Sequence, residues 1–186
     1  FATSAIITAI LAFAMQDTLG NVLGGLAIHL DHSVEIGDWI VLDNISGQVT
    51  DIRWRYTKVL TRNGEKVVIP NSQLMKNKFN VVGTDSSRNN AWRRWIWFNI
   101  GLDFAPARII DIAERSLKDA RIERVAKDPA PSCVLMGFGP GYLRYAMRYW
   151  LLDPLHDDPT DSVVRVHILS ALEREAAADR SWEGTL

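Results

Sequence analysis

The chain has 186 residues, enough for one large domain or for two to three small ones. Its 21 basic and 22 acidic residues leave a formal net charge of −1, so it lacks the basic field on which nucleic-acid binding depends. A single cysteine, Cys133, excludes an internal disulfide framework and a multi-cysteine zinc site, and its apolar neighbours predict a core residue.

Residues 1–30 are predominantly apolar. The first fifteen carry no charge, and Asp17 is the only ionised residue ahead of Leu30. A bilayer core roughly 30 Å thick needs about 20 apolar helical residues, so this segment is expected to form one transmembrane helix. Its many small residues favour close packing between helices, which indicates a wall element of an assembly. A buried helix in the core of a soluble protein is the alternative interpretation.

The same segment is expected to bend. Three glycines fall in its second half: Gly20, Gly24 and Gly25. Because glycine and inserted polar groups are among the causes of helix bending, we expect two helical halves, 1–15 and 18–30, with a bend near Gln16–Gly20. The chain begins without the basic start and cleavage site of a signal peptide, so the segment is interpreted as following further sequence in a longer polypeptide.

Residues 31–83 are expected to form short strands closed by tight turns. Turn residues occur at Gly37-Asp38 and at 43–47. Alternating apolar and polar residues over 48–62 predict strand structure there. Asn63-Gly64 then predicts a hairpin that leads into a last strand ending at Pro70. Four or five short strands indicate a small barrel or sandwich.

Residues 91–180 change period and are expected to form an α+β domain, after a polar linker at 84–90. The predicted strands are 93–102, 134–139 and 142–152, and the predicted helices are 106–120 and 161–178. Asp103 precedes the first helix as a candidate cap. The order β-α-β-β-α implies an antiparallel-leaning sheet with helices on one face.

No catalytic constellation is recognisable in the sequence, and neither a cofactor nor a metal is predicted. The glycine-rich stretch 137–141 lacks the Lys-Ser/Thr of a phosphate loop, so a hairpin turn is favoured. His29, Asp31 and His32 could bind a metal, but a polar cluster just beyond a membrane helix is favoured. A second acidic run could also bind a metal, although a solvated loop is the preferred interpretation. It consists of Asp153, His156, Asp157, Asp158 and Asp161.

Several spaced motifs agree in order with a known family. They are Ala14-Met15-Gln16-Asp17-Thr18-Leu19-Gly20-Asn21, Ile36-Gly37-Asp38-Trp39-Ile40, Gly47-x-Val49-x-x-Ile52-x-x-Arg55-x-Thr57-x-Val59, Asn63-Gly64 and Val68-Ile69-Pro70-Asn71-Ser72-x-Leu74. On these motifs the chain resembles the MscS family of small-conductance mechanosensitive channels. The C-terminal third agrees with that family only in the order of its elements, and its end, 179–184, lacks the closing Pro-rich strand.

The resemblance implies a membrane pore helix (1–30) followed by an all-β, Sm-like small barrel (31–83) and an α+β, ferredoxin-like cytoplasmic domain (91–180). It further implies a homoheptamer in the bacterial inner membrane, with the residues after about 30 in the cytoplasm. Membrane tension would open its pore and release ions and small osmolytes on hypoosmotic shock. The expected partners are other copies of the chain, the lipid bilayer and ions, with no nucleic acid.

The resemblance also assigns site residues. Ala9 and Phe13 fall at the two pore constrictions, where the family commonly has leucine, and Phe13 is favoured as the gate because Ala9 lies on the small-residue face. The residues at the bend are Gln16, Asp17, Gly20 and Asn21. Seven copies of Asp17 would form an acidic ring that favours cations. The β-domain motif residues are Gly37, Asp38, Gly47, Arg55, Pro70 and Asn71.

Two other functions remain open from the residues. A small five-stranded barrel resembles the Sm-like fold, and four basic residues along one predicted strand would suit an RNA-binding module. They are Arg53, Arg55, Lys58 and Arg62. A membrane scaffold that does not conduct is the second alternative.

Overall fold

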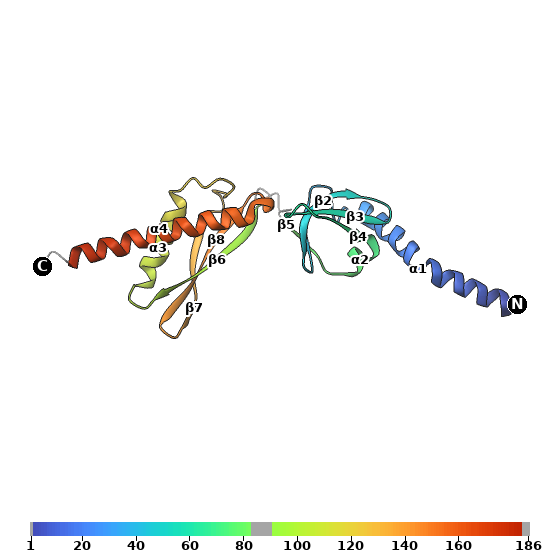
Figure 1. Ribbon diagram of the computed structural model, residues 1–186, viewed down its shortest axis with the longest axis horizontal. Helices are drawn as coiled ribbons and strands as arrows, with labels where there is room; N and C mark the ends of the chain where they lie inside the picture. Colours follow the sequence, from blue (N-terminus) through green and yellow to red (C-terminus); the bar gives the residue numbers. More distant parts are fainter. Residues whose placement is uncertain (1, 83–90, 184–186) are drawn as a thin grey trace. The chain divides into compact units, whose positions relative to one another are not determined.

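The computed structural model describes residues 2–82 and 91–183 (Figure 1). The linker predicted at 84–90 lies outside these residues. The chain divides into two compact units, 1–84 and 85–186, which are described separately below.

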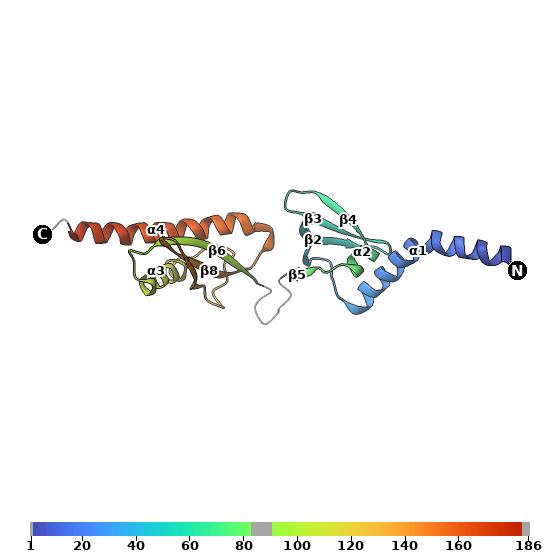
Figure 2. The same ribbon diagram turned by 90° about the horizontal axis from the view of Figure 1, so that it is seen from below.

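The first unit begins with one long helix, α1 (Ala2–Asp31). The helix is continuous through Gln16–Gly20, where two helical halves joined by a bend were expected. Its sequence contains no proline, so every residue keeps the backbone N–H that helix hydrogen bonding needs. A glycine within a helix costs only about 1 kcal/mol relative to alanine, which weakens the helix without ending it. Figure 2 shows the axis of α1 changing direction along its length.

A five-stranded antiparallel sheet follows, with strand order β4-β3-β2-β1-β5. Its strands are β1 (Trp39–Leu42), β2 (Ile45–Ile52), β3 (Tyr56–Thr61), β4 (Lys66–Pro70) and β5 (Asn80–Val82). Inward-facing residues of these strands form one apolar core with the end of α1 and with a short helix, α2 (Asn71–Lys76). The fully buried members of this core include Ile28, Ile40, Leu42, Val49, Val59 and Leu74.

The region over 48–62, where alternation predicted strand structure, holds parts of two strands, β2 and β3. The backbone N–H of Arg53 donates to the carbonyl of Tyr56 at 2.8 Å, which closes a tight turn between β2 and β3. Alternation continues across this turn because both strands present alternate residues to one core, so the sequence pattern does not reveal the break. The hairpin predicted at Asn63-Gly64 is present, with Gly64 at φ +80° between β3 and β4. Helix α2 was not predicted, since six residues are too few to show a helical period.

The second unit has the element order β-α-β-β-α, as predicted. Its elements are β6 (Trp92–Gly101), α3 (Pro106–Lys118), β7 (Ser132–Gly139), β8 (Tyr142–Leu151), a 3₁₀ turn η2 (Pro154–His156) and α4 (Asp157–Glu183). The strands form a three-stranded antiparallel sheet in the order β6-β8-β7. Helices α3 and α4 pack on one face, and the core between contains residues such as Ile96, Tyr145, Met147, Ile109 and Val164 (Figures 1 and 2).

Two predicted details of this unit are wrong. Asp103 does not cap α3, because Ala105 occupies the N-cap position and Pro106 begins the helix. Helix α4 begins at Asp157 rather than at Asp161. The acidic run interpreted as a solvated loop therefore includes the first turns of a helix, where Asp157 and Asp161 are buried.

Candidate functional site

The apolar surface of α1 is almost entirely exposed in the single chain. The stretch Thr3–Asp31 is long and apolar enough to cross a membrane, and 0% of its most apolar window is buried. The exposed large side chains include Ile6, Ile10, Leu11, Phe13, Leu19, Leu23 and Leu26. A contiguous apolar surface of this kind marks a site of membrane or protein contact.

The two predicted constriction residues lie on this exposed part of the helix. Phe13 is 77% exposed, the most open of the large apolar residues of α1. Ala9 is also exposed and precedes Phe13 by four residues, so the two share one side of the helix. Gln16 and Asp17 are exposed as well, one turn further along.

The glycines in the second half of α1 face the β domain. A Cβ atom added to Gly24 would lie 3.0 Å from the backbone C and O atoms of Asn71. One added to Gly25 would lie 2.6 Å from the Asn71 Nδ2 atom and 2.6 Å from the carbonyl oxygen of Trp54. Real Cβ atoms do not approach other atoms that closely, so glycine at position 25 allows the helix to touch the β2–β3 turn. We call this contact region, formed by residues 20–25, 53–57 and 70–72, the helix–β junction.

Asn21 connects the two sides of the junction. Its Oδ1 atom accepts a hydrogen bond from the backbone N–H of Ser72 at 2.9 Å, and its Nδ2 atom donates to the carbonyl of Asp17 at 2.9 Å. Ser72 lies in the first turn of α2, whose N-cap residue, Pro70, has no side-chain hydrogen bond to offer. The first N–H groups of a helix need outside acceptors, and Asn21 supplies one from α1.

Asn71 is the buried centre of the junction. It is 0% exposed. Its Nδ2 atom donates to the carbonyl of Arg53 at 2.8 Å, and its backbone N–H donates to the carbonyl of Arg55 at 3.0 Å. Its Oδ1 atom accepts from the Thr57 hydroxyl at 2.9 Å. The amide therefore has partners on both atoms, as a buried polar side chain requires, and it holds the β2–β3 turn against α2.

The remaining motif residues shape the β domain away from the junction. Gly37 has φ +104°, which suits glycine, and its N–H donates to the carbonyl of Val49 at 2.8 Å. Asp38 accepts a hydrogen bond from the N–H of Glu35 at 2.9 Å, closing the turn before β1. A Cβ at Gly47 would lie 2.4 Å from the Leu60 carbonyl oxygen, so glycine permits the close approach of β2 and β3.

The structure thus separates the predicted residues into three groups: those on the exposed part of α1, those at the turns and strands of the β domain, and those at the helix–β junction. Gly20, Asn21, Arg55, Pro70 and Asn71 meet at the helix–β junction, with Asp17 contributing its carbonyl. Sequence reasoning gave no role to Thr57, Ser72 and Trp54 there. A signal existed for Thr57, because it lies on the inward face of its strand, two residues before the buried Val59. Arg55 also stacks its guanidinium over the Trp54 ring, 5.0 Å from the centroid.

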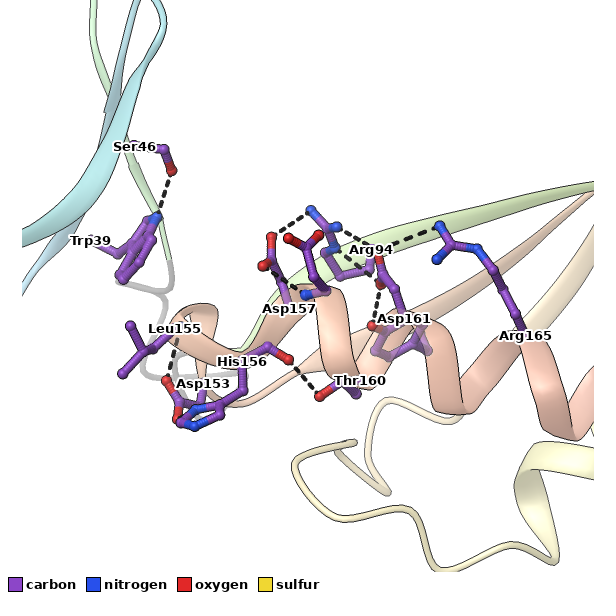
Figure 3. A network of polar contacts seen from close by, with 12 residues as sticks. Trp39, Ser46, Arg94, Asp153, Leu155, His156, Asp157, Thr160, Asp161 and Arg165 are labelled. Carbon is purple, nitrogen blue, oxygen red and sulfur yellow. Dashed lines mark hydrogen bonds and ion pairs between the residues drawn. The ribbon is translucent and has the colours of Figure 1, made fainter. Parts of the chain in front are cut away.

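A second polar cluster was not predicted. In the second unit, Arg94 on β6 forms ion pairs with Asp161 at 2.5 Å and with Asp157 at 3.4 Å (Figure 3). The hydroxyl of Tyr149 on β8 donates to Asp161. Burial lowers the pKa of Arg94, but its hydrogen bond and ion pairs with the two carboxylates outweigh burial and raise that pKa overall. Burial and the hydrogen bond to Asp161 raise the pKa of Tyr149. These contacts fix the start of α4 against the sheet.

The basic strand that suited an RNA-binding module is partly neutralised. Arg53 and Lys58 both form ion pairs with Asp51, at 2.9 Å and 3.2 Å. Within residues 2–82 and 91–183, no group of three His, Cys, Asp or Glu side chains is placed to hold a metal ion. Cys133 is buried, and burial raises the pKa of its thiol to about 11, which makes it unreactive near neutral pH.

Comparison with known proteins gives consistent results. Residues 17–80 match the family model described as the mechanosensitive ion channel β-domain. An uncharacterised MscS family protein, YhdY of Bacillus subtilis, is 34% identical over 110 residues, covering 59% of this chain and 28% of that protein. The large-conductance mechanosensitive channel MscMJLR of Methanocaldococcus jannaschii is 30% identical over 142 residues, covering 75% of this chain and 38% of that protein. The chain therefore spans less than half the length of these relatives.

A solved structure supports the fold. The closed-state crystal structure of Helicobacter pylori MscS matches with a TM-score of 0.75 at 18% identity, covering 93% of this chain and 66% of that chain. The predicted fold class is confirmed in that a helix followed by antiparallel sheets has the architecture of MscS cytoplasmic domains, with one candidate apolar helix at the N-terminal end.

Proposed function

Because this chain belongs to the MscS family, we propose that it is part of a mechanosensitive channel subunit whose α1 helix lines a membrane pore. One observation carries the proposal. The apolar helix α1 is exposed along most of its length, and its C-terminal part is attached to a folded β domain at the helix–β junction. Opened by membrane tension, such a channel would release ions and small osmolytes on hypoosmotic shock. One of the relatives, MscMJLR, is named as a mechanosensitive channel, and none of the residues described above forms a catalytic constellation.

The length of α1 fits a membrane span with its end outside the lipid. At about 1.5 Å per residue, its 30 residues reach roughly 45 Å, against a bilayer core of about 30 Å. About twenty residues would cross the core, and the last turns would project beyond it. The polar step Gln16–Thr18 then lies near the boundary, where Asp17 avoids the cost of a charge in lipid. The junction residues follow on the cytoplasmic side.

Phe13 is proposed as the gate, with Ala9 one turn before it. Several copies of α1 around one axis would present a ring of Phe13 side chains, and a narrow apolar ring blocks ions by dewetting. Membrane tension favours the conformation with the larger in-plane area, so it shifts the closed–open equilibrium through that difference alone. The junction would keep the cytoplasmic end of α1 attached to the β domain while the gate widens, with the bend near Gln16–Asn21 accommodating the movement.

The proposed assembly is a homoheptamer in the bacterial inner membrane, with the residues after about 30 in the cytoplasm. It is supported by the exposed apolar side chains of α1 and by its small residues, which suit close contact between helices. A ring of Asp17 at the cytoplasmic mouth would favour cations. Replacing Asp17 by Asn should then move the reversal potential in a salt gradient, and an unchanged potential would reject the ring.

Patch recordings under suction test the function. The protein should show conductance that rises with pressure, and Phe13→Ser should raise the resting conductance because a polar ring no longer excludes water. Leu11→Ser is the matched control, since helical spacing places Leu11 on the opposite side from Phe13 and it is also exposed. Equal leak from both variants would reject Phe13 as the gate. A correctly inserted protein without pressure-dependent conductance would favour the non-conducting scaffold.

A further inference from the structure

One face of the sheet in the second unit carries an unusual set of side chains. Strands β6, β7 and β8 contain four arginines and no aspartate or glutamate. One of the arginines, Arg94, faces the helices and is neutralised by Asp157 and Asp161. The other three alternate with the core residues of their strands and therefore lie on the opposite face.

Tryptophans of β6 and β8 lie on the same face as these arginines. In the β6–β8 register, Arg93 lies opposite Trp150, Trp95 opposite Arg148, Trp97 opposite Ala146, and Asn99 opposite Arg144. None of these residues belongs to the apolar core that α3 and α4 cover. We call the set Arg93, Trp95, Trp97, Arg144, Arg148 and Trp150 the Arg/Trp face.

The rings and guanidinium groups of this face form a stacked layer. The guanidinium carbons of Arg93 and Arg148 lie 5.0 Å and 5.8 Å from the Trp95 ring centroid. The Trp95 and Trp97 rings stack with centroids 5.8 Å apart and an interplanar angle of 14°. Trp95 is thus flanked on several sides, whereas Trp97 is 53% exposed. The layer therefore presents one open aromatic surface, that of Trp97.

The positive charge of the face is not balanced. Within the part of the chain that the structure describes, Arg93, Arg144 and Arg148 form no ion pair with a carboxylate; Arg148 donates only to the Ser132 hydroxyl at 3.1 Å. A cation over an aromatic ring at an exposed site is held only weakly, so these contacts leave the guanidinium groups able to bind an anion. Arginine suits phosphate in particular, because its planar group can donate two parallel hydrogen bonds.

We infer that the Arg/Trp face binds a free nucleoside polyphosphate, whose base stacks on Trp97 and whose phosphates contact Arg144 and Arg148. Arg144 lies two residues from the partner of Trp97 on the adjacent strand, a diagonal position that long side chains reach. A nucleic-acid strand would need successive open rings and a longer basic track, whereas this face offers one open ring and three cations. The inference does not depend on the channel proposal.

Binding can be measured by isothermal titration calorimetry on the whole chain in detergent, with ATP in EDTA as the probe. Tripolyphosphate supplies the charge without the ring, and adenosine supplies the ring without the charge. Since stacking and phosphate contact both contribute, each of these should bind at least about 10-fold more weakly than ATP. A ten-nucleotide oligoadenylate is the comparison for a strand.

Two variants locate the site. Trp97→Ala should weaken ATP binding about 10-fold. Trp54→Ala is its matched control, because Trp54 is 59% exposed, about as much as Trp97, and it should leave binding unchanged. Arg144→Gln should weaken binding and reduce its salt dependence, and this exposed position keeps the test available should Trp97→Ala fail to fold.

Four results would overturn the inference. They are the absence of ATP binding at millimolar concentration, equal binding of tripolyphosphate and ATP, equal effects of Trp97→Ala and Trp54→Ala, and tighter binding of the oligoadenylate than of ATP. The last would assign the face to a nucleic-acid strand. None of these binding experiments measures conductance, so their results do not bear on the channel proposal.

Discussion

The glycines of α1 approach the β domain to different degrees, and this grading predicts how alanine will act at each position. A Cβ at Gly20 would lie 3.7 Å from its nearest neighbour, an ordinary contact distance. At Gly24 the nearest atoms would be 3.0 Å away, in the backbone of α2. At Gly25 they would be 2.6 Å away and would include the carbonyl oxygen of Trp54, which cannot move without moving the β2–β3 turn.

The expected magnitudes follow from two opposing effects. Alanine is more favourable than glycine inside a helix by about 1 kcal/mol. Nothing opposes that gain at Gly20, so Gly20→Ala should stabilise the first unit by up to about 1 kcal/mol. Overpacking costs roughly 1–3 kcal/mol, so Gly25→Ala should range from nearly neutral to about 2 kcal/mol destabilising. Gly24→Ala should fall between the two.

Thermal unfolding of the chain in detergent, followed by tryptophan fluorescence, measures the difference. For a domain of this size, 1 kcal/mol corresponds to roughly 4–8 °C in Tm, so Gly25→Ala should melt several degrees below Gly20→Ala. The comparison is internal, because both variants make the same chemical change in the same helix. If Gly25→Ala proved as stable as Gly20→Ala, α1 would not dock on the β domain as described, and the helix–β junction would be refuted.

Three further changes test the buried polar groups by chemical denaturation. Thr57→Val removes the hydroxyl that donates to Asn71 at 2.9 Å, and the unpaired buried amide should lower the free energy of unfolding by about 1–3 kcal/mol. Asp161→Asn takes a buried carboxylate from Arg94 and should cost roughly 3 kcal/mol, since Arg94 keeps its second carboxylate. Burial raises the pKa of the Cys133 thiol from 9.0 to about 11, so above pH 9 the unfolded chain loses this proton first and stability falls as pH rises to about 11. Cys133→Ala should flatten that fall.

Matched controls separate these effects from general damage. Thr50→Val removes an exposed hydroxyl from the neighbouring strand and should change stability by less than about 0.5 kcal/mol. Asp111→Asn breaks an exposed ion pair within α3 and should cost about 0.3–0.5 kcal/mol. Equal losses from Thr57→Val and Thr50→Val, or from Asp161→Asn and Asp111→Asn, would contradict the assigned roles. If the stability of Cys133→Ala fell between pH 9 and 11 as steeply as that of the parent protein, the role assigned to the Cys133 thiol would be contradicted.

The sequence alone determined much of the architecture. The uncharged run at the start predicts a long apolar helix, because composition alone shows whether a segment is long and apolar enough to cross a membrane. Asn63-Gly64 predicts its hairpin, since few residues adopt the backbone angles that a tight turn needs. Alternation along residues 142–152 correctly placed Tyr145, Met147 and Tyr149 on the core side. These features are local, so the order of residues is sufficient to reveal them.

Only the tertiary structure decided which faces meet. Asn21 and Ser72 are 51 positions apart, and neither residue type indicates that one will cap the helix of the other. Alternation did not reveal the break between β2 and β3, because both strands contribute alternate residues to one core. Likewise, adjacent arginines at 93 and 94 have opposite surroundings, one on the open Arg/Trp face and one against Asp161. Periodicity assigns a side chain to a face, but the partner on that face depends on how distant segments pack, and that information is not carried by any local stretch of the chain.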